Sequence, residues 1–208
     1  GNVGPEMLIP LARQFDEPMV DSSMLPTFLV SQLVRQHCTV ALGGDGADEL
    51  FGGYTNYSRI LKSASMTRYM PQVVGNAISS LSATLLPQGF RGRNWLKALS
   101  SDLNTSLPLV ALLFDANYRE RLLLGSNIDI SGECAEEVWR LRIPKSKGLL
   151  DRTTRMDFKN YLPEDILVKI DRASMMNSLE LRAPFLNADI IEFAFSRVPE
   201  RLKANNNQ

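Results

Sequence analysis

Residues 42–54 read LGGDGADELFGGY, and the expected elements on either side follow from this stretch. The residues before it, 38–42, form a short apolar run without polar alternation, which is typical of a strand buried on both faces of a parallel sheet. Glycines at 43, 44 and 46 predict a tight turn, and residues 47–51 then read as a helix that a glycine pair ends. The stretch therefore predicts a strand, a turn and a helix within an α/β domain.

The turn also has the character of a ligand site. Ligands of α/β proteins bind at the carboxyl ends of parallel strands, where glycines let backbone N–H groups approach closely and a helix start adds positive charge. Asp45, Asp48 and Glu49 would repel bare phosphate, so a divalent cation such as magnesium is expected between them and a phosphate. Composition and turn chemistry alone leave a second reading open, in which these acids only cap an ordinary turn.

Helical spacing of apolar residues predicts helices on both sides of this stretch. One helix covers about 5–15, and another follows a Ser22 or Ser23 cap, has Pro26 in its first turn and ends near His37. Residues 179–185 are expected to be extended around Pro184. The remaining predicted helices cover 67–86, 91–102, 107–123, 133–142, 149–161, 163–178 and 187–197.

The predicted fold class is therefore α/β, with a parallel sheet that is incomplete in these residues and is followed by a predominantly helical region. Residues 1–54 would end the α/β part, and 55–208 would form the mainly helical part. A parallel strand needs partners reached through crossovers of about a dozen residues or more, and too few strands are visible to complete a sheet.

Composition excludes several classes of function. The formal net charge is zero, so no field of one sign favours binding to nucleic acid or to a membrane surface. No apolar run of about 18 residues predicts a membrane span, and no signal peptide opens the sequence. Cys38 and Cys134 lack metal-site spacing and fit a reducing cytoplasm. The one histidine, His37, argues against a Ser-His-Asp triad and a multi-histidine metal site.

Residues 44–54 resemble the signature loop of asparagine synthases, Gly-Asp-Gly-x-Asp-Glu-Leu-Phe-Gly-Gly-Tyr, at every specified position. Two further stretches, 16–26 and 165–186, agree with the family in order and character, and the resemblance covers about 5–200. It implies an adenine-nucleotide α-hydrolase-like domain. In such enzymes the β-carboxylate of aspartate attacks the α-phosphate of ATP, and ammonia then displaces AMP to give asparagine, AMP and pyrophosphate.

The resemblance also implies cofactors, partners and location. ATP and Mg²⁺ are the expected cofactors, and the partners are aspartate, glutamine-derived ammonia and an N-terminal glutaminase domain of the intact chain. The family reading allows a homodimer and places the protein in the cytoplasm. Two alternatives stay open: an amidotransferase acting on a sugar acid in surface-polysaccharide biosynthesis, and a non-catalytic helical assembly module.

Site residues follow from the same resemblance. Asp48 would be the magnesium ligand, and the candidate catalytic residues are Asp45, Asp165 and Asp171. An acid at Asp45 favours the asparagine-forming branch over β-lactam synthetases, which carry tyrosine there. The nucleotide would be lined by residues of the loop itself, namely Leu42, Gly43, Gly44, Asp45 and Gly46.

Two readings remain for the charged residues in the stretch 165–186. The charges of Asp165, Lys169, Asp171 and Arg172 either form surface pairs at helical spacing or help to close the active site, because small and apolar residues follow them directly. Glu180 and Arg182 alternate with apolar residues and are expected to be a structural pair.

Three family elements are absent from the sequence. It lacks the Ser-Gly-Gly-x-Asp-Ser pyrophosphate loop, the glutaminase cysteine nucleophile and the later Lys-x-x-Phe segment, of which Lys203 is not the lysine. We therefore expect a fragment that is inactive on its own.

Overall fold

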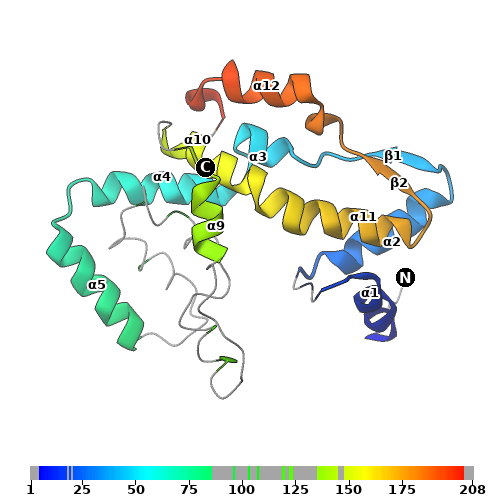
Figure 1. Ribbon diagram of the computed structural model, residues 1–208, viewed down its shortest axis with the longest axis horizontal. Helices are drawn as coiled ribbons and strands as arrows, with labels where there is room; N and C mark the ends of the chain where they lie inside the picture. The colour runs from blue at the N-terminus through cyan, green and yellow to red at the C-terminus, as the bar shows by residue number, and fades with distance from the viewer. Residues whose placement is uncertain are drawn as a thin grey trace. The chain divides into compact units, whose positions relative to one another are not determined.

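The computed structural model describes residues 5–17, 19, 21–85, 96, 103, 107, 119, 122–123, 135–144 and 148–203 (Figure 1). By its contacts the chain divides into two units. The first comprises Gly1–Phe51 and Asp157–Pro199, and the second comprises Gly52–Met156 and Glu200–Gln208. The helices predicted over 91–102 and 107–123 lie almost entirely outside the described residues, so their prediction stays untested.

The first unit contains most of the elements that the sequence predicts. Its predicted strand and following helix are confirmed, and so are the helices predicted around 5–15, 24–37, 163–178 and 187–197. In chain order the elements are η1 Pro5–Met7, α1 Leu8–Gln14, α2 Met24–Arg35, β1 Val40–Leu42, α3 Ala47–Phe51, η2 Leu162–Ile166, α11 Leu167–Met175, β2 Glu180–Arg182, η3 Pro184–Leu186 and α12 Ala188–Ser196. Ser23 is the N-cap residue of α2, as predicted, but its side chain makes no capping hydrogen bond.

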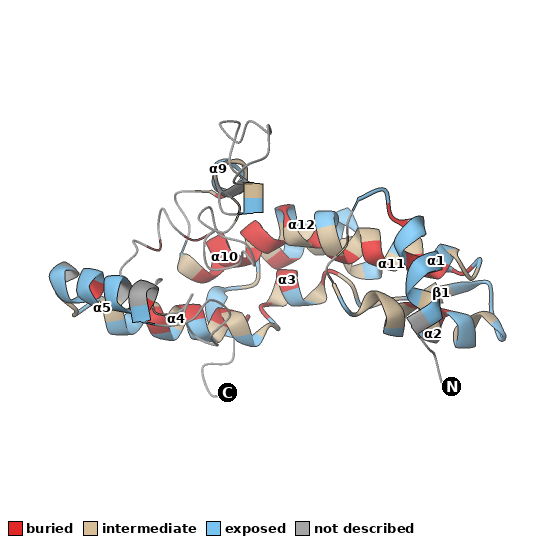
Figure 2. Cartoon of the chain, turned by 90° about the horizontal axis from the view of Figure 1, so that it is seen from below, coloured by how far each residue is buried: buried red, intermediate tan, exposed pale blue. Residues whose placement is uncertain are grey.

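Helices α1, α2 and α11 share the core of this unit (Figure 2). Leu11, Phe28 and Ala173 are buried together, one from each helix. The Asn177 side chain then joins the end of α11 to α2, because its amide donates to the carbonyl oxygens of Phe28, at 3.1 Å, and Ala173, at 3.3 Å. This packing holds α11 against the part of the chain that precedes the signature stretch.

β1 and β2 form a two-stranded parallel sheet in the described part of the chain, with Ala41 opposite Leu181. The prediction of a parallel neighbour for residues 38–43 is confirmed. The prediction that this strand is buried on both faces is wrong, because Val40 is 38% exposed and Leu42 is 73% exposed. A strand with one paired neighbour has fewer side chains against it than a strand inside a sheet covered by helices.

The second unit contains α4 Thr55–Thr67, α5 Gln72–Leu85, α9 Ala135–Leu141, the first part of α10 Leu149–Lys159, and η4 Glu200–Leu202. Its main core cluster joins Ile60 of α4 to Ile143 and Met156. The sequence predicted a helix over 67–86 and missed α4. The buried face of α4 explains why. Ser63 occupies a buried position one turn after Ile60, so a polar residue interrupts the helical spacing of apolar residues on that face.

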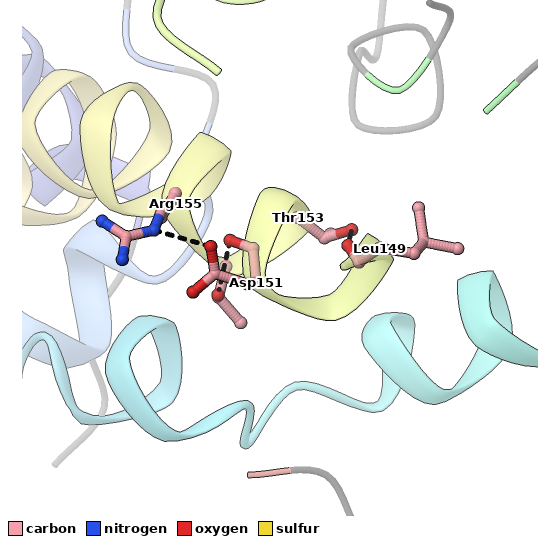
Figure 3. A network of polar contacts seen from close by, with 5 residues as sticks. Leu149, Asp151, Thr153 and Arg155 are labelled. Carbon is pink, nitrogen blue, oxygen red and sulfur yellow. Dashed lines mark hydrogen bonds and ion pairs between the residues drawn. The ribbon is translucent and has the colours of Figure 1, made fainter. Parts of the chain in front are cut away.

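Several polar residues of α10 are buried, and hydrogen bonds within the helix engage some of them (Figure 3). Arg155 Nε donates to Asp151 Oδ2 at 2.7 Å, and Thr153 Oγ1 donates to the Leu149 carbonyl at 2.8 Å. Buried polar groups are tolerated when they find such partners. None of the helices in the described part of the chain has both the length and the apolar character that crossing a bilayer requires.

Candidate active site

The signature stretch begins where the two strands end. The Gly43 amide donates to the Arg182 carbonyl at 2.8 Å, so the turn leaves the carboxyl ends of β1 and β2 together. Gly46 has φ +90°, and a Cβ there would lie 2.5 Å from Leu186 Cδ2. Only glycine meets both requirements without strain. Gly44 differs, because a Cβ at that position would meet no atom within 4 Å.

A cavity of about 320 Å³ opens beside this turn within the first unit. Its polar lining consists of Asp45 from the turn, Asp171 and Ser174 from α11, and Arg182 from β2. Two of the three predicted catalytic residues, Asp45 and Asp171, therefore share one cavity although they are distant in the sequence. Pockets of this size are typical of small-molecule sites.

Lys169 of α11, which precedes the cavity-lining Ile170 and Asp171 in sequence, forms an ion pair with Asp21, which lies before α2. Lys169 Nζ is 2.5 Å from Asp21 Oδ2, and both side chains are largely buried. Burial of Asp21 opposes its ionisation, but hydrogen bonds from Lys169 and Ser23 outweigh it and lower the pKa of Asp21. Asp21 is thus held as a carboxylate against the Lys169 ammonium.

The pKa values of Asp45 and Asp165 shift in the opposite direction to that of Asp21, because both are raised. Burial raises the pKa of Asp45, although its own backbone amide and the positive charge of Lys169 act against the rise. Burial also raises the pKa of Asp165, assisted by the negative charge of Asp21 and opposed by Lys169. Lys169 therefore influences all three carboxylates electrostatically.

Asp165 does not line the cavity and belongs to the acidic surroundings of Tyr161. Burial, followed by the charges of Asp165, Asp21, Asp157 and Glu49, raises the pKa of Tyr161 to about 12. Within the described part of the chain, the buried Oδ1 of Asp165 has no hydrogen-bond partner. With a pKa raised to about 12, Tyr161 stays protonated at neutral pH.

The two acids of the α3 start lie in different environments. Asp48 is exposed, whereas Glu49 is buried with 1% of its surface accessible. Among the described residues no group of three or more metal-ligating side chains is present. Magnesium commonly takes only one or two protein carboxylates and completes its coordination with substrate phosphates. Asp48 therefore fits an ion held jointly with phosphates and not a site in which the protein supplies every ligand.

The other predicted site residues divide into two groups. Leu42 and Gly44 are exposed, and Gly43 packs so that a Cβ would meet Asp45 Oδ2 at 2.5 Å. Glu180 and Arg182 form the expected pair, with Arg182 Nε 2.7 Å from Glu180 Oε1. In the stretch 165–186, the ion pairs of Lys169 and Arg172 reach Asp21 and Asp16 and not residues at helical spacing, and a role of the stretch in closing the active site stays a prediction. Arg172 pairs with Asp16 at an exposed position, whereas Lys169 is buried.

Sequence reasoning missed Asp21 and Tyr161 and left Lys169 undecided. Asp21 belongs to the stretch 16–26 that resembles the family, and its partner Lys169 lies 148 residues away. Tyr161 had no signal beyond its place in a predicted helix. A useful signal would have been the Asp-Ser-Ser sequence at 21–23, which predicts an acid fixed by the backbone of a helix start.

Comparison with known proteins now adds to this geometry. The family model for asparagine synthase matches residues 4–208. The chain belongs to the asparagine synthase family. It is 32% identical over 194 residues to asparagine synthetase (glutamine-hydrolyzing) 1 of Bacillus subtilis, covering 92% of this chain and 30% of that protein. It is 36% identical over 190 residues to a protein of Mycobacterium bovis provisionally named as an asparagine synthetase, covering 90% of this chain and 28% of the relative.

A more distant asparagine synthase relative comes from Methanocaldococcus jannaschii, at 29% identity over 173 residues, 82% of this chain and 32% of the relative. The chain therefore spans less than a third of the length of these proteins. No solved structure matches this chain.

Proposed function

We propose that this chain forms part of the adenylation site of an ATP-dependent amidotransferase that converts aspartate to asparagine. The observation that carries the proposal is the shared cavity of Asp45 and Asp171 at the carboxyl ends of β1 and β2. Family membership and the names of the relatives supply the class of reaction. We also propose that β1 and β2 are two strands of an adenine-nucleotide α-hydrolase-like sheet.

The signature loop would bind ATP through its backbone. Gly44 is exposed and open, so a phosphate or ribose can approach the N–H groups of the turn. Leu42, Gly43 and Gly46 would contribute contacts on either side of it. Asp48 would hold the magnesium ion, which when bound offsets the negative charge of the phosphates.

The proposed reaction has two substitution steps, the first at the α-phosphorus of ATP and the second at the activated carboxyl carbon of aspartate. A carboxylate oxygen of aspartate bonds to the α-phosphorus and pyrophosphate leaves. Ammonia nitrogen next bonds to the activated carbon, AMP leaves, and one proton must leave the nitrogen. We assign that proton to the Asp45 carboxylate, because burial raises its pKa and so makes it a better proton acceptor than an ordinary aspartate.

Asp171 and Lys169 would orient the site from α11. The Lys169–Asp21 pair fixes the helix against the segment before α2, and the charge of Lys169 reaches Asp45 and Asp165. Preorganised charges of this kind typically contribute a few kcal/mol to transition-state stabilisation. The 208 residues contain neither the Ser-Gly-Gly-x-Asp-Ser loop nor the Lys-x-x-Phe segment, so we expect the chain alone to form no AMP.

The test uses the full-length protein that carries this chain. Exchange of labelled pyrophosphate into ATP should depend on aspartate, and Asp45→Asn and Asp171→Asn should each reduce amide formation strongly without unfolding the protein. A hexuronic acid in place of aspartate tests the sugar-acid alternative. Exchange that depends on the sugar acid and not on aspartate would overturn the proposed substrate, and the absence of exchange with either would favour a non-catalytic module.

A further inference from the structure

The corner at which α4 meets α5 exposes a group of apolar side chains (Figure 1). Tyr69 is 84% exposed and Val73 is 78% exposed, and Met66 and Val74 are exposed beside them in the sequence. Single exposed apolar residues are common on protein surfaces, but several within one short segment mark an interaction surface. We call Met66, Tyr69, Val73 and Val74 the corner patch.

The backbone beneath the corner patch has internal hydrogen-bond partners. The Met70 amide donates to the Thr67 carbonyl at 3.0 Å, and the Val74 amide donates to the Pro71 carbonyl at 2.9 Å. Because these amides are already paired, covering the corner with an apolar phase costs less free energy than covering an open loop of the same length.

The segment that carries the corner patch is basic and contains no acidic residue. Residues 50–101 include six lysine and arginine residues but no aspartate or glutamate. The net charge of zero therefore describes the chain as a whole and conceals a local excess of positive charge. Lys62 interacts with another group of the chain, so the cations considered for this surface are Arg59 and Arg68.

Arg59 and Arg68 flank the corner patch. Arg59 is exposed and precedes Met66 by seven residues, which places both on one face of α4. Arg68 is exposed, and its guanidinium lies 5.9 Å from the centre of the Tyr69 ring. In the described part of the chain neither guanidinium forms an ion pair. A guanidinium that stacks on a ring still presents its N–H groups to phosphate oxygens.

We propose that this corner binds the surface of a membrane that contains anionic lipids. Met66 and Val73 enter the boundary between headgroups and acyl chains, where apolar side chains leave water. Tyr69 has an apolar ring and a polar hydroxyl group, a combination that is enriched at the headgroup level. Arg59 and Arg68 contact the lipid phosphates, and the attraction of each cation to an anionic surface adds to the apolar contribution.

The combination of charge and apolar surface favours a membrane over two other partners. Nucleic acid also presents phosphates, but it offers no apolar phase to Met66 and Val73. A second copy of the chain in a two-fold contact would place the same patch on both sides. Arg59 and Arg68 would then face like charges, which is unfavourable across an interface.

The test is cosedimentation of the full-length protein that carries this chain with lipid vesicles. The protein should sediment with vesicles of mixed phosphatidylcholine and phosphatidylglycerol, and not with vesicles of phosphatidylcholine alone. Arg68→Gln and Val73→Ser should each weaken binding about fivefold, the first by removing a cation and the second by removing apolar surface. Both side chains are exposed, so the variants should fold normally.

Matched controls come from α1 in the first unit, where Arg13→Gln and Ile9→Ser remove an equally exposed cation and apolar side chain. These two variants should bind the mixed vesicles as the unchanged protein does. Equal weakening by the α1 and corner variants would overturn the proposal, and so would equal sedimentation with both kinds of vesicle or no sedimentation at all.

Two further outcomes would assign the surface to another partner and so overturn the proposal. One is tighter binding to a DNA oligonucleotide than to the mixed vesicles, with a loss in Arg68→Gln and none in Val73→Ser. The other is self-association that Val73→Ser abolishes, without vesicle binding. The measurement uses neither ATP nor aspartate, so its result is independent of the proposed adenylation.

Discussion

The ammonium group of Lys169 lies 2.5 Å from Asp21 Oδ2 and joins α11 to the segment before α2. Lys169 is 8% exposed, and its charge also acts on Asp45 and Asp165. The pair has a structural consequence, because it fastens two segments that are distant in the sequence. It also has an electrostatic consequence, because a single cation is shared among carboxylates of the candidate site.

Replacing Lys169 should destabilise the first unit. Lys169→Met leaves the largely buried Asp21 without its cation, and we expect the free energy of unfolding to fall by about 2 kcal/mol. Arg172→Met is the control on the same helix, since Arg172 pairs with an exposed Asp16 and such pairs contribute less than about 1 kcal/mol. Urea denaturation measures both, and equal losses in the two variants would contradict a special role for the Lys169 pair.

Asp21 and Asp165 should give opposite pH dependences of stability. The folded pKa of Asp21 is lowered, so its contribution is present above the unfolded value of about 3.9 and is lost as pH falls through the folded pKa. Asp21→Asn should therefore be less stable than the unchanged chain near neutral pH, with the difference shrinking below about pH 4.

Asp165 has a raised folded pKa, so its ionisation opposes folding at every pH above that pKa, and the penalty is relieved as pH falls toward about 3.9. Asp165→Asn should be the more stable protein near neutral pH, and the gain should vanish in acid. Urea midpoints measured across this range test both variants, and a parallel response of the two would refute the assigned shifts.

Substitution of Asp48 should mainly affect activity, whereas substitution of Glu49, the next residue of α3, should mainly affect stability. Asp48 is exposed at the helix start, so Asp48→Asn should abolish adenylation in the full-length protein while leaving it folded. Glu49 is 1% exposed, so Glu49→Gln should lower the thermal unfolding temperature and retain more activity. Pyrophosphate exchange and thermal unfolding are measured together. Near-normal exchange in Asp48→Asn, or complete loss confined to Glu49→Gln, would reverse the roles.

Two glycines of the turn should respond differently to an added methyl group. Gly46→Ala combines a positive φ with a Cβ 2.5 Å from Leu186, and we expect a loss of about 2 kcal/mol in unfolding free energy. Gly44→Ala has open space at the Cβ and should change stability by less than about 0.5 kcal/mol. Chemical denaturation of both variants measures the difference, and equal effects would show that the turn tolerates either residue.

The local elements of this protein and its family could be inferred from the order of its residues alone. An apolar run followed by glycines and a helix start has few local solutions, so β1, the turn and α3 could be predicted from residues 38–51 alone. Helical spacing likewise predicted α2 and α12. The signature loop also indicated Asp45 and Asp48 as site residues. Its glycines, which let a ligand approach the backbone, and its carboxylates lie next to one another in the sequence, so this part of the site could be predicted locally.

Contacts between residues that are distant in the sequence depend instead on how the segments pack in three dimensions. The pairing of β1 with β2, the cavity shared by Asp45 and Asp171, and the contact of Lys169 with Asp21 all join segments separated by more than a hundred residues. The burial of Glu49 beside an exposed Asp48 is also a tertiary property, because both acids occupy the first turn of one helix. Periodicity reports which faces of a helix differ, whereas packing against other segments determines which charge is desolvated and which cation stands beside it.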